Sequence, residues 1–437
     1  MCKMNNHVEA TGSSNADPAS HFGATKVTPR SVVIVGAGHA GFQVAASLRQ
    51  EGFDGHIALV NDGPVPPYQR PPLSKSYLLG QCGVSSLLFR PERYYSDNKI
   101  ELINDTRVVA IDRECRRVLL ASGSHLNFDH LVLAVGLQNR TLPIPGAELQ
   151  GVFGLRTIAD ADAIRAAISK ANDVVVVGAG FIGLEFAAAA SAMGKSVRVF
   201  ELLDRVMARA VTPEISRVFA EAHLSWGVKI EFGQGLLRVE GKGGRVVGVE
   251  TTNATRHKAD MVVFGLGATP HVSLARESGL EVENGIKVNA ELLTSDPMIS
   301  AIGDCASFPT ALSGPHVRLE SVQNAADQAR AVAKRLTGKS GRYVALPWFW
   351  SDQRDLKLQI AGLSTGFDRN VVIGSPADQE MSVLSFKHDK LIGVQSINRS
   401  ADHVAARKLL SRGIPTLNPA EANRDGFDLK ELEATSR

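Results

Sequence analysis

The chain contains 437 residues, of which 44% are hydrophobic and 21% charged, and its formal net charge is +3. This length exceeds what one ordinary hydrophobic core serves, so we expect two or three domains. The nearly neutral charge argues against a dedicated nucleic-acid-binding protein. No apolar run approaches the roughly 18 residues of a membrane span. Neither a nucleic acid nor a membrane is therefore expected as a partner.

The cysteines and the N-terminal segment indicate the cellular compartment in which the protein is expected. The four cysteines, Cys2, Cys82, Cys115 and Cys305, are scattered and form no C-x-x-C pair. This usage is typical of a reducing compartment, excludes a disulfide framework and predicts no metal site, so a cytoplasmic protein is expected. Residues 1–30 lack the apolar run of a secretory signal and are predicted to form a disordered leader.

A nucleotide-binding fingerprint is expected at residues 32–41, VVIVGAGHAG. An apolar β-branched run precedes the G-x-G-x-x-G pattern, and a helical pattern follows it. In such a fingerprint Gly36 permits the tight turn, Gly38 lets the backbone approach a pyrophosphate, and Gly41 lets the helix pack on the strand. The helix N-terminus then faces the phosphates. A second predicted strand, HIALVND, completes the alternation that builds a parallel sheet.

Two candidate site residues follow this first fingerprint. Asp62 lies about 20 residues beyond it at a predicted strand end, where a carboxylate can accept ribose hydroxyls. An ordinary turn aspartate is the alternative. The proline-rich segment 62–80 predicts an ordered loop over the sheet edge. Within it, Lys75 can hydrogen-bond the redox edge of a flavin and stabilise its reduced ring, although composition alone favours a solvated lysine.

A second copy of the fingerprint lies about 140 residues further on, at residues 174–183, VVVVGAGFIG. Gly178, Gly180 and Gly183 take the same three roles as the first set of glycines. One copy alone is a weak signal, because a glycine-rich turn that binds nothing is also possible. Two copies in the same strand, turn and helix context predict two bound nucleotides.

The residue at the end of the next predicted strand bears on nucleotide choice. Glu201 occupies the ribose-binding position, and its carboxylate repels a 2′-phosphate, which favours NADH over NADPH. Arg198 and Arg205 lie close by in the sequence and leave a 2′-phosphate site open as an alternative.

The remaining chain divides into three patterns. Short strands with glycine turns at residues 228–264 predict a β-meander appended to the second unit. Residues 285–306 predict strands that end in Gly-Asp, and residues 320–338 predict a helix. From residue 346 a small α+β region begins with PWFWSDQ and ends in a polar tail.

Two further candidates come from these patterns. Asp304 follows a predicted strand in AIGDC, where it can hold a ribityl chain, but this short signal is worthless in isolation. Trp348 and Trp350 flank Phe349 in PWFWSDQ, and such a cluster more often marks a core or an interface than a flavin-stacking site.

Together these motifs resemble the FAD-dependent, NADH-using ferredoxin reductases of bacterial oxygenase systems, the putidaredoxin and rubredoxin reductase family. The resemblance runs from about residue 31 to the end of the chain. It includes both fingerprints, PPLSK, LPIPG, GFIGLE, VRLESVQNA and PWFWSDQ in order. The implied fold is α/β and glutathione-reductase-like, with two Rossmann-type domains and a small C-terminal α+β domain. The implied division is a discontinuous FAD domain at 31–145 and 272–345, an NADH domain at 146–271 and an interface domain at 346–437.

The resemblance also implies roles for individual residues. FAD contacts are implied for Ala40, Asp62, Lys75, Val108, Arg156, Asp304 and Val322. Lys75 is expected at the redox end of the ring, and Trp350 on the flavin face away from the nicotinamide. Glu185 is expected near the nicotinamide, with an ordinary helix-face carboxylate as the alternative.

The implied activity is hydride transfer from NADH to FAD, followed by single-electron transfer to a 2Fe-2S ferredoxin. We expect docking near Trp350, with Arg93, Arg342 and Arg354 steering an acidic partner. A monomer or weak dimer is expected.

Disulfide chemistry is not expected, because residues 42–80 contain no cysteine where disulfide reductases of this fold carry a pair. Two alternatives stay open. One is a monodehydroascorbate-reductase-like enzyme that reduces small organic acceptors. The other is an NADH-sensing flavoprotein similar to apoptosis-inducing factor.

Overall fold

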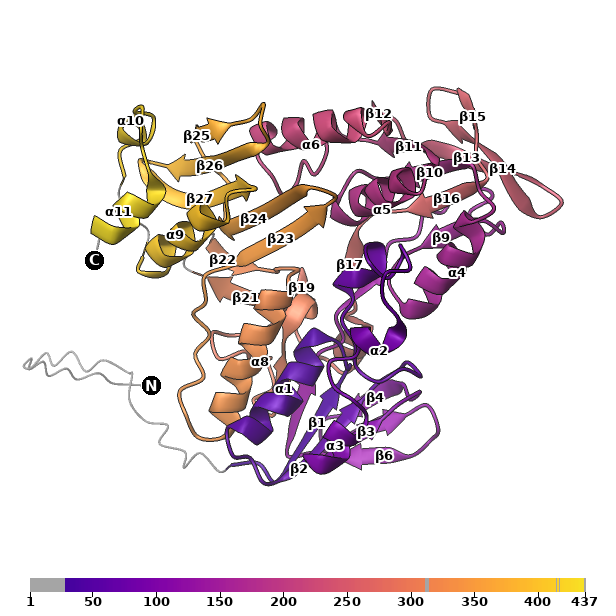
Figure 1. Cartoon of the computed structure of the whole chain (residues 1–437). Coiled ribbons are helices and arrows are strands. Elements are labelled where there is room, and N and C mark those ends of the chain that lie inside the picture. Colours follow the sequence, from indigo (N-terminus) through magenta and orange to yellow (C-terminus); the bar gives the residue numbers. More distant parts are fainter. Residues whose placement is uncertain (1–27, 311–313, 414, 416, 436–437) are drawn as a thin grey trace, which may run out of the picture.

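The computed structural model describes residues 28–310, 314–413, 415 and 417–435 (Figure 1). The predicted disordered leader, apart from residues 28–30, lies outside the described residues.

The first unit is built on a five-stranded parallel sheet with strand order β20-β7-β1-β2-β3. Its strands are β1 (Ser31–Val35), β2 (His56–Val60), β3 (Ile100–Ile103), β7 (His130–Leu133) and β20 (Ile299–Ala301). Helices α1 (His39–Gln50) and α8 (Val322–Leu336) lie side by side in this unit (Figure 1). Because β20 and α8 come from far down the chain, the chain leaves this unit and later returns to it.

Smaller elements surround the first sheet. One antiparallel sheet contains β4 (Val108–Asp112), β5 (Arg117–Leu120) and β6 (His125–Asn127). A mixed sheet contains β18 (Val282–Glu283), β19 (Gly285–Lys287), β21 (Ala306–Thr310) and β22 (Gly314–Val317), of which β19 and β21 pair in parallel. The short helices are α2 (Val84–Leu87), α3 (Arg93–Asp97) and α7 (Ser273–Glu277), with 3-10 turns η1 (Pro71–Ser74) and η2 (Gly303–Cys305).

The second unit contains another five-stranded parallel sheet, with order β12-β11-β10-β16-β9. Its strands are β9 (Val152–Gly154), β10 (Asp173–Val177), β11 (Ser196–Glu201), β12 (Lys229–Phe232) and β16 (Met261–Phe264). Its helices are α4 (Ile158–Ile168), α5 (Phe181–Ala192) and α6 (Pro213–Ser225). Strands β13 (Leu236–Lys242), β14 (Arg245–Thr251) and β15 (Arg256–Lys258) form a separate antiparallel sheet. The two chain crossings between the units, β8 (Leu137–Asn139) and β17 (Ala268–Pro270), pair with each other.

The C-terminal unit is a five-stranded antiparallel sheet with order β23-β24-β27-β26-β25. Its strands are β23 (Trp348–Gln353), β24 (Leu356–Gly362), β25 (Arg369–Ser375), β26 (Glu380–Lys387) and β27 (Lys390–Ile397). Helices α9 (Ser400–Ser411), α10 (Pro419–Ala422) and α11 (Leu429–Thr435) complete it, with α9 packed on β24 and β27 (Figure 1). The predicted class, α/β with two Rossmann-type units and a small α+β unit, is thus confirmed.

Two local expectations are wrong. The strand predicted to open the meander is β12, which pairs in parallel with β11 because its residues extend the nucleotide-binding sheet. The expected polar tail contains three helices, since a small apolar stripe of α9, including Ala406 and Leu409, packs on the sheet. The proline-rich loop starts beside the end of the edge strand β3, where the Asp105 N–H donates to the Gly63 carbonyl oxygen, and its turn η1 packs on α4 and α5 of the second unit.

The hydrophobic core explains how the units are held together. One buried cluster joins Leu73 and Leu78 of the proline-rich loop, Phe186 of α5, and Leu358 of the C-terminal sheet. Residues from all three units therefore exclude water at one junction.

A core substitution in α6 tests this packing. Phe219 is fully buried, whereas Leu224 on the same helix is 68% exposed. We expect Phe219→Ala to lower the free energy of unfolding by about 3–5 kcal/mol, because it leaves a cavity. Leu224→Ala should change it by less than about 0.5 kcal/mol. Chemical denaturation followed by circular dichroism measures both, and equal effects would contradict the assigned packing.

Candidate functional site

The first glycine loop has the geometry of a phosphate cradle. Gly36 has φ +100°, and a Cβ there would meet the Ala134 carbonyl oxygen at 2.5 Å. A Cβ on Gly41 would lie 1.8 Å from the Gly36 carbonyl oxygen, so only glycine lets α1 pack this closely. A Cβ on Gly38 would meet nothing within 4 Å. The N-terminus of α1 therefore opens onto free space, as an approaching pyrophosphate requires.

The second loop repeats this construction at the start of α5. Gly178 has φ +99°, and a Cβ on Gly183 would lie 2.1 Å from the Gly178 carbonyl oxygen. Around Gly180 the nearest atom to such a Cβ is 4.0 Å away. The two loops thus carry the same close contacts and the same open position, which fits one nucleotide each.

The strand ends beside the loops differ. Glu201 accepts hydrogen bonds from the backbone N–H groups of Ala179, at 2.6 Å, and Leu203, at 2.9 Å. It thereby links its strand end to the glycine loop and keeps acceptor positions free for hydroxyl groups.

In the first unit Asn61 occupies the position that Glu201 occupies in the second. Val60 pairs with Val35 in the first sheet, and Phe200 pairs with Val177 in the second, so the next residue in each strand is the equivalent one. Asp62 lies one residue further along, with an exposed side chain 3.8 Å from the Arg107 guanidinium. Arg107 precedes Val108, the buried first residue of β4, so Asp62 and Val108 lie at one edge of the first unit.

Both arginines near Glu201 are already engaged. Arg198 forms an ion pair with Glu231. Arg205 donates to the carbonyl oxygens of Val211, at 2.9 Å, and Ala208, at 2.7 Å. Neither guanidinium is left free for a 2′-phosphate, which removes the sequence argument for NADPH.

Lys75 and Glu185 form an ion pair of 2.9 Å where the units meet. Among the described residues this is the one ion pair that joins the first unit to the second. Ser74 Oγ donates to Glu185 Oε2 at 2.6 Å, and Ser351 Oγ donates to Glu185 Oε1 at 2.7 Å. The Glu185 side chain is 5% exposed. Its ionised carboxylate is therefore stabilised by donors from η1, the following lysine and β23.

A second charged group lies beside the first glycine loop. Arg70 donates to the Arg156 carbonyl oxygen at 2.9 Å. Burial, with a contribution from Arg70, lowers the pKa of Arg156, whose guanidinium makes no ion pair among the described residues. Burial, followed by the nearby Glu320, raises the pKa of Asp304 to about 7.

Asp304 is held close to the first loop. Gln328 Oε1 accepts from the Gly303 N–H at 2.7 Å, and a Cβ on Gly303 would lie 3.0 Å from the Ala40 Cβ. Ala40, Asp304 and Arg156 therefore gather near the start of α1. A cradle with open space, an unpaired guanidinium and a desolvated carboxyl group fits a bound dinucleotide.

The aromatic cluster occupies both faces of β23. The rings of Trp348 and Trp350 lie 5.5 Å apart on one face. On the other face Phe349 lies 4.6 Å from Phe181 of α5, and Ser351 bonds Glu185. Val322, the first residue of α8, is adjacent to Gln323, whose Oε1 accepts from the Trp348 N–H at 3.1 Å. Strand β23 thus meets the start of α8 at the border of the first and C-terminal units.

Sequence reasoning missed several residues of this junction. Ser74, Ser351, Arg70 and Phe181 belong to it, but a serine or arginine carries no pattern of its own. All four lie in or beside motifs already recognised, but those motifs do not indicate which of their residues meet at this junction.

The predicted docking arginines stand on different parts of the fold. Arg354 packs over the Trp226 ring at 5.0 Å and donates to Ser191 Oγ, so it lies against the second unit. Arg93 belongs to α3 of the first unit, and Arg342 follows α8.

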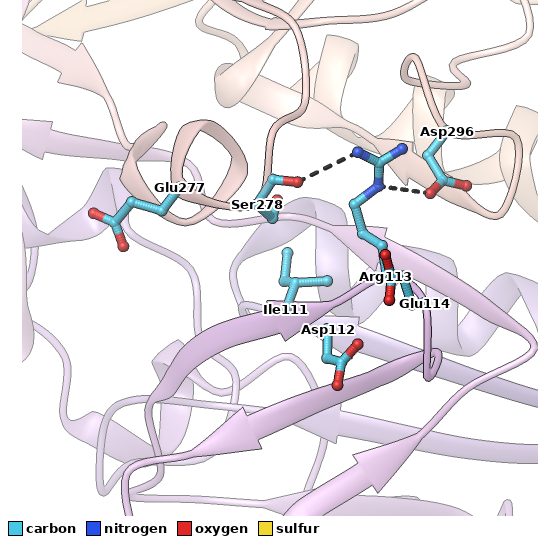
Figure 2. Close-up of a pocket in the computed structure, with 7 residues that line it drawn as sticks. All are labelled: Ile111, Asp112, Arg113, Glu114, Glu277, Ser278 and Asp296. Carbon is cyan, nitrogen blue, oxygen red and sulfur yellow. Dashed lines mark hydrogen bonds and ion pairs between the residues drawn. The ribbon is translucent and has the colours of Figure 1, made fainter.

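A groove of about 570 Å³ lies between β4 and α7, away from both glycine loops (Figure 2). Arg113 Nε donates to Asp296 at 2.8 Å inside it, and a second nitrogen donates to the Ser278 carbonyl oxygen at 3.4 Å. Because none of its lining residues belongs to a glycine loop or to the Lys75–Glu185 pair, this groove is not the candidate site. In the described part of the chain no group of His, Cys, Asp and Glu is arranged to hold a metal ion, and no helix there is long and apolar enough to cross a bilayer.

In the described part of the chain the cysteines, Cys82, Cys115 and Cys305, are free and form no pair with one another. Burial raises the pKa of Cys305 to about 11, so its thiol stays protonated. Two nucleotide cradles, with no cysteine pair among residues 28–435 as far as they are described, define a two-nucleotide oxidoreductase whose chemistry lies in its cofactors.

Comparison with known proteins identifies the family. Residues 30–329 match the family described as pyridine nucleotide-disulphide oxidoreductase, and residues 348–433 match the reductase C-terminal family. The chain belongs to the pyridine nucleotide-disulphide oxidoreductase family.

Individual relatives are similar over nearly their whole length. Rhodocoxin reductase from Rhodococcus erythropolis is 48% identical, over 92% of this chain and 93% of its own. Putidaredoxin reductase from Pseudomonas putida is 39% identical, over 93% and 97%. The crystal structure of the ferredoxin reductase for the CYP199A2 system from Rhodopseudomonas palustris has a TM-score of 0.90 and 50% identity, covering 92% of this chain and 100% of that one. The covalent putidaredoxin reductase–putidaredoxin complex also has a TM-score of 0.90, with 39% identity, covering 93% and 98%.

A pair of glycine substitutions tests the first cradle. Gly38→Ala meets open space, so we expect the variant to fold but to lose most of its FAD, because the methyl group occupies the pyrophosphate position. Gly41→Ala collides with backbone and should not give soluble protein. Flavin absorbance per chain and circular dichroism measure both. Full flavin content in folded Gly38→Ala would contradict the cradle.

Proposed function

We propose that this protein is an NADH:ferredoxin oxidoreductase with FAD and NADH as its cofactors. The observation that carries the proposal is the pair of glycine cradles joined by the Lys75–Glu185 ion pair. FAD, when bound, accepts a hydride from NADH and releases the two electrons singly to an iron–sulfur partner. The similarity to rhodocoxin reductase and putidaredoxin reductase supports this activity.

We assign the two nucleotides by their positions in the fold. FAD belongs to residues 31–145 and 272–345, and NADH to residues 146–271, with 346–437 as the interface domain. The extra polar groups at the first loop, Arg156 and Asp304, support the larger cofactor there. The engaged arginines around Glu201 support NADH over NADPH in the second cradle.

Each proposed site residue has a task. The chain holds the FAD phosphates over α1 with Gly36, Gly38 and Gly41, and Ala40 lines that approach. Asp62 and Val108 lie on the adenosine side. Lys75 would contribute positive charge at the redox end of a bound flavin, and Trp350 would cover the flavin face opposite the nicotinamide. Glu185 orients Lys75, and the remaining contacts are proposed for Arg156, Asp304 and Val322.

The partner is proposed to be a ferredoxin of the 2Fe-2S type. A solved relative forms a covalent complex with putidaredoxin, which supports a small redox protein as acceptor. We further propose a cytoplasmic protein that is a monomer or weak dimer, with no nucleic acid or membrane partner.

The partner docks, in this proposal, at a groove of about 420 Å³ between α8 and α9. Trp348, Val404 and Arg407 line it, and Val404 is 50% exposed. The Arg407 guanidinium lies over the Trp348 ring at 4.5 Å, and Trp348 contacts Trp350. An exposed apolar residue beside an unpaired cation suits an acidic partner with an apolar contact patch.

The activity is tested by NADH-driven cytochrome c reduction with and without a panel of 2Fe-2S ferredoxins. A large ferredoxin-dependent stimulation is expected. NADH-dependent bleaching of the flavin without stimulation by any ferredoxin would favour reduction of a small organic acceptor or an NADH sensor. Absence of bleaching would reject NADH as the donor.

Charge reversal tests the docking groove. We expect Arg407→Glu to lower the ferredoxin-dependent rate about tenfold at low salt, because a rim charge acts on association. Ferricyanide reduction by NADH should stay unchanged. Arg245→Glu, at an exposed position that begins the distant strand β14, is the matched control. Equal ferredoxin-dependent rates for both variants would exclude this groove as the docking surface.

A further inference from the structure

A chain of buried hydrogen bonds leads from α6 to Glu185. Gln353 Oε1 lies 2.8 Å from His223 Nε2, Gln353 Nε2 donates to Ser351 Oγ at 3.3 Å, and Ser351 donates to Glu185. His223 and Ser351 are fully buried, and Gln353 is 1% exposed. No solvent reaches these groups, so each depends on its neighbour for a partner.

In this series of hydrogen bonds every donor points towards Glu185. Burial lowers the pKa of His223 to about 4, so the ring is neutral at neutral pH and carries one N–H. Gln353 Oε1 only accepts, which places that proton on Nε2. The amide then donates to the Ser351 hydroxyl, and the hydroxyl proton has the Glu185 carboxylate as its acceptor. In a series of hydrogen bonds with one direction, each bond polarises the next donor, and this series ends on the Glu185 carboxylate, its only negatively charged group.

Ser351 also fixes the position of Glu185 Oε1, the oxygen that Lys75 contacts. Lys75 Nζ and Ser351 Oγ both contact Glu185 Oε1, at 2.9 Å and 2.7 Å. Ser74 holds the other oxygen. Loss of the Ser351 hydroxyl leaves Oε1 with the lysine alone, and the carboxylate can then rotate towards it.

We propose that Ser351 is a positioning residue for hydride transfer, which fixes Glu185 and through it Lys75 at the junction of the two nucleotides. This inference rests on the function proposed above. It assigns to Ser351, in the C-terminal unit, a role on the nicotinamide side of the proposed flavin site. Ser351 itself acts through Glu185 and is not a catalytic residue.

A matched pair of variants isolates the hydroxyl. Ser351→Thr keeps a hydroxyl group, and Ser351→Val has nearly the same shape as threonine without one. Both suit a strand. Ser385→Ala is a second control, since Ser385 is buried in β26 and bonds Asn370 away from Glu185. Flavin content and thermal unfolding show whether each variant folds.

Two readouts test the proposal on the FAD-loaded protein. The first is the limiting rate of anaerobic flavin reduction by NADH in a stopped-flow instrument. The second is the dissociation constant of NAD⁺ for the oxidised protein, measured by calorimetry without turnover. We expect Ser351→Val to lower the rate and weaken NAD⁺ binding about tenfold relative to Ser351→Thr, the scale of one hydrogen bond to a charged group. Ser385→Ala should match the wild type in both.

The outcomes separate this inference from the proposed function. If NADH reduces the wild-type flavin while the threonine and valine variants behave alike in both readouts, Ser351 only packs and the inference is rejected. If NADH does not reduce the wild-type flavin, the proposed function is rejected and the inference falls with it.

Discussion

The buried carboxylate of Glu185 requires donors, and the rest of the junction is arranged around that requirement. An ionised carboxylate is costly to bury unless it is paired and hydrogen-bonded. Its donors are Ser74 and Lys75 from the first unit and Ser351 from the C-terminal unit, while Glu185 itself stands on a helix of the second. The three units therefore cannot change their relative positions without breaking a hydrogen bond to this charge. A shared apolar cluster around Leu73 and Phe186 keeps water away from it.

The repeated glycine loop explains why we propose that this junction faces two nucleotides. Each loop sits at the carboxyl end of a central parallel strand, where a helix N-terminus meets open space. The ion pair joins the helix that follows the second loop to the turn that extends from the first unit. The two faces of strand β23 serve different parts of the molecule. Trp348 and Trp350 lie on the face towards the proposed docking groove, and Ser351 lies on the face towards Glu185. The proposed electron exit and the hydride entry thus share one strand.

Much of this arrangement could be predicted from local patterns. The fingerprints predicted both cradles, because the close contacts of Gly41 and Gly183 tolerate no side chain. Glu201 was found from its distance to the second loop. Ser351 was not, since it is 166 residues from Glu185 and serine has no distinctive pattern. The helix α9 was missed because a narrow stripe in an otherwise polar segment gains its stability from the sheet beneath it. The three docking arginines were grouped by charge alone, and contacts such as that of Arg354 with Trp226 depend on tertiary structure.

The central claim is that the reactive ends of both nucleotides meet beside the Lys75–Glu185 pair. A crystal structure of the FAD-loaded protein with NAD⁺ bound tests it most directly. The account predicts the nicotinamide stacked on the flavin, with Lys75 Nζ in hydrogen-bonding distance of the flavin and still paired with Glu185. A nicotinamide bound elsewhere, or a flavin ring remote from Lys75, would contradict it.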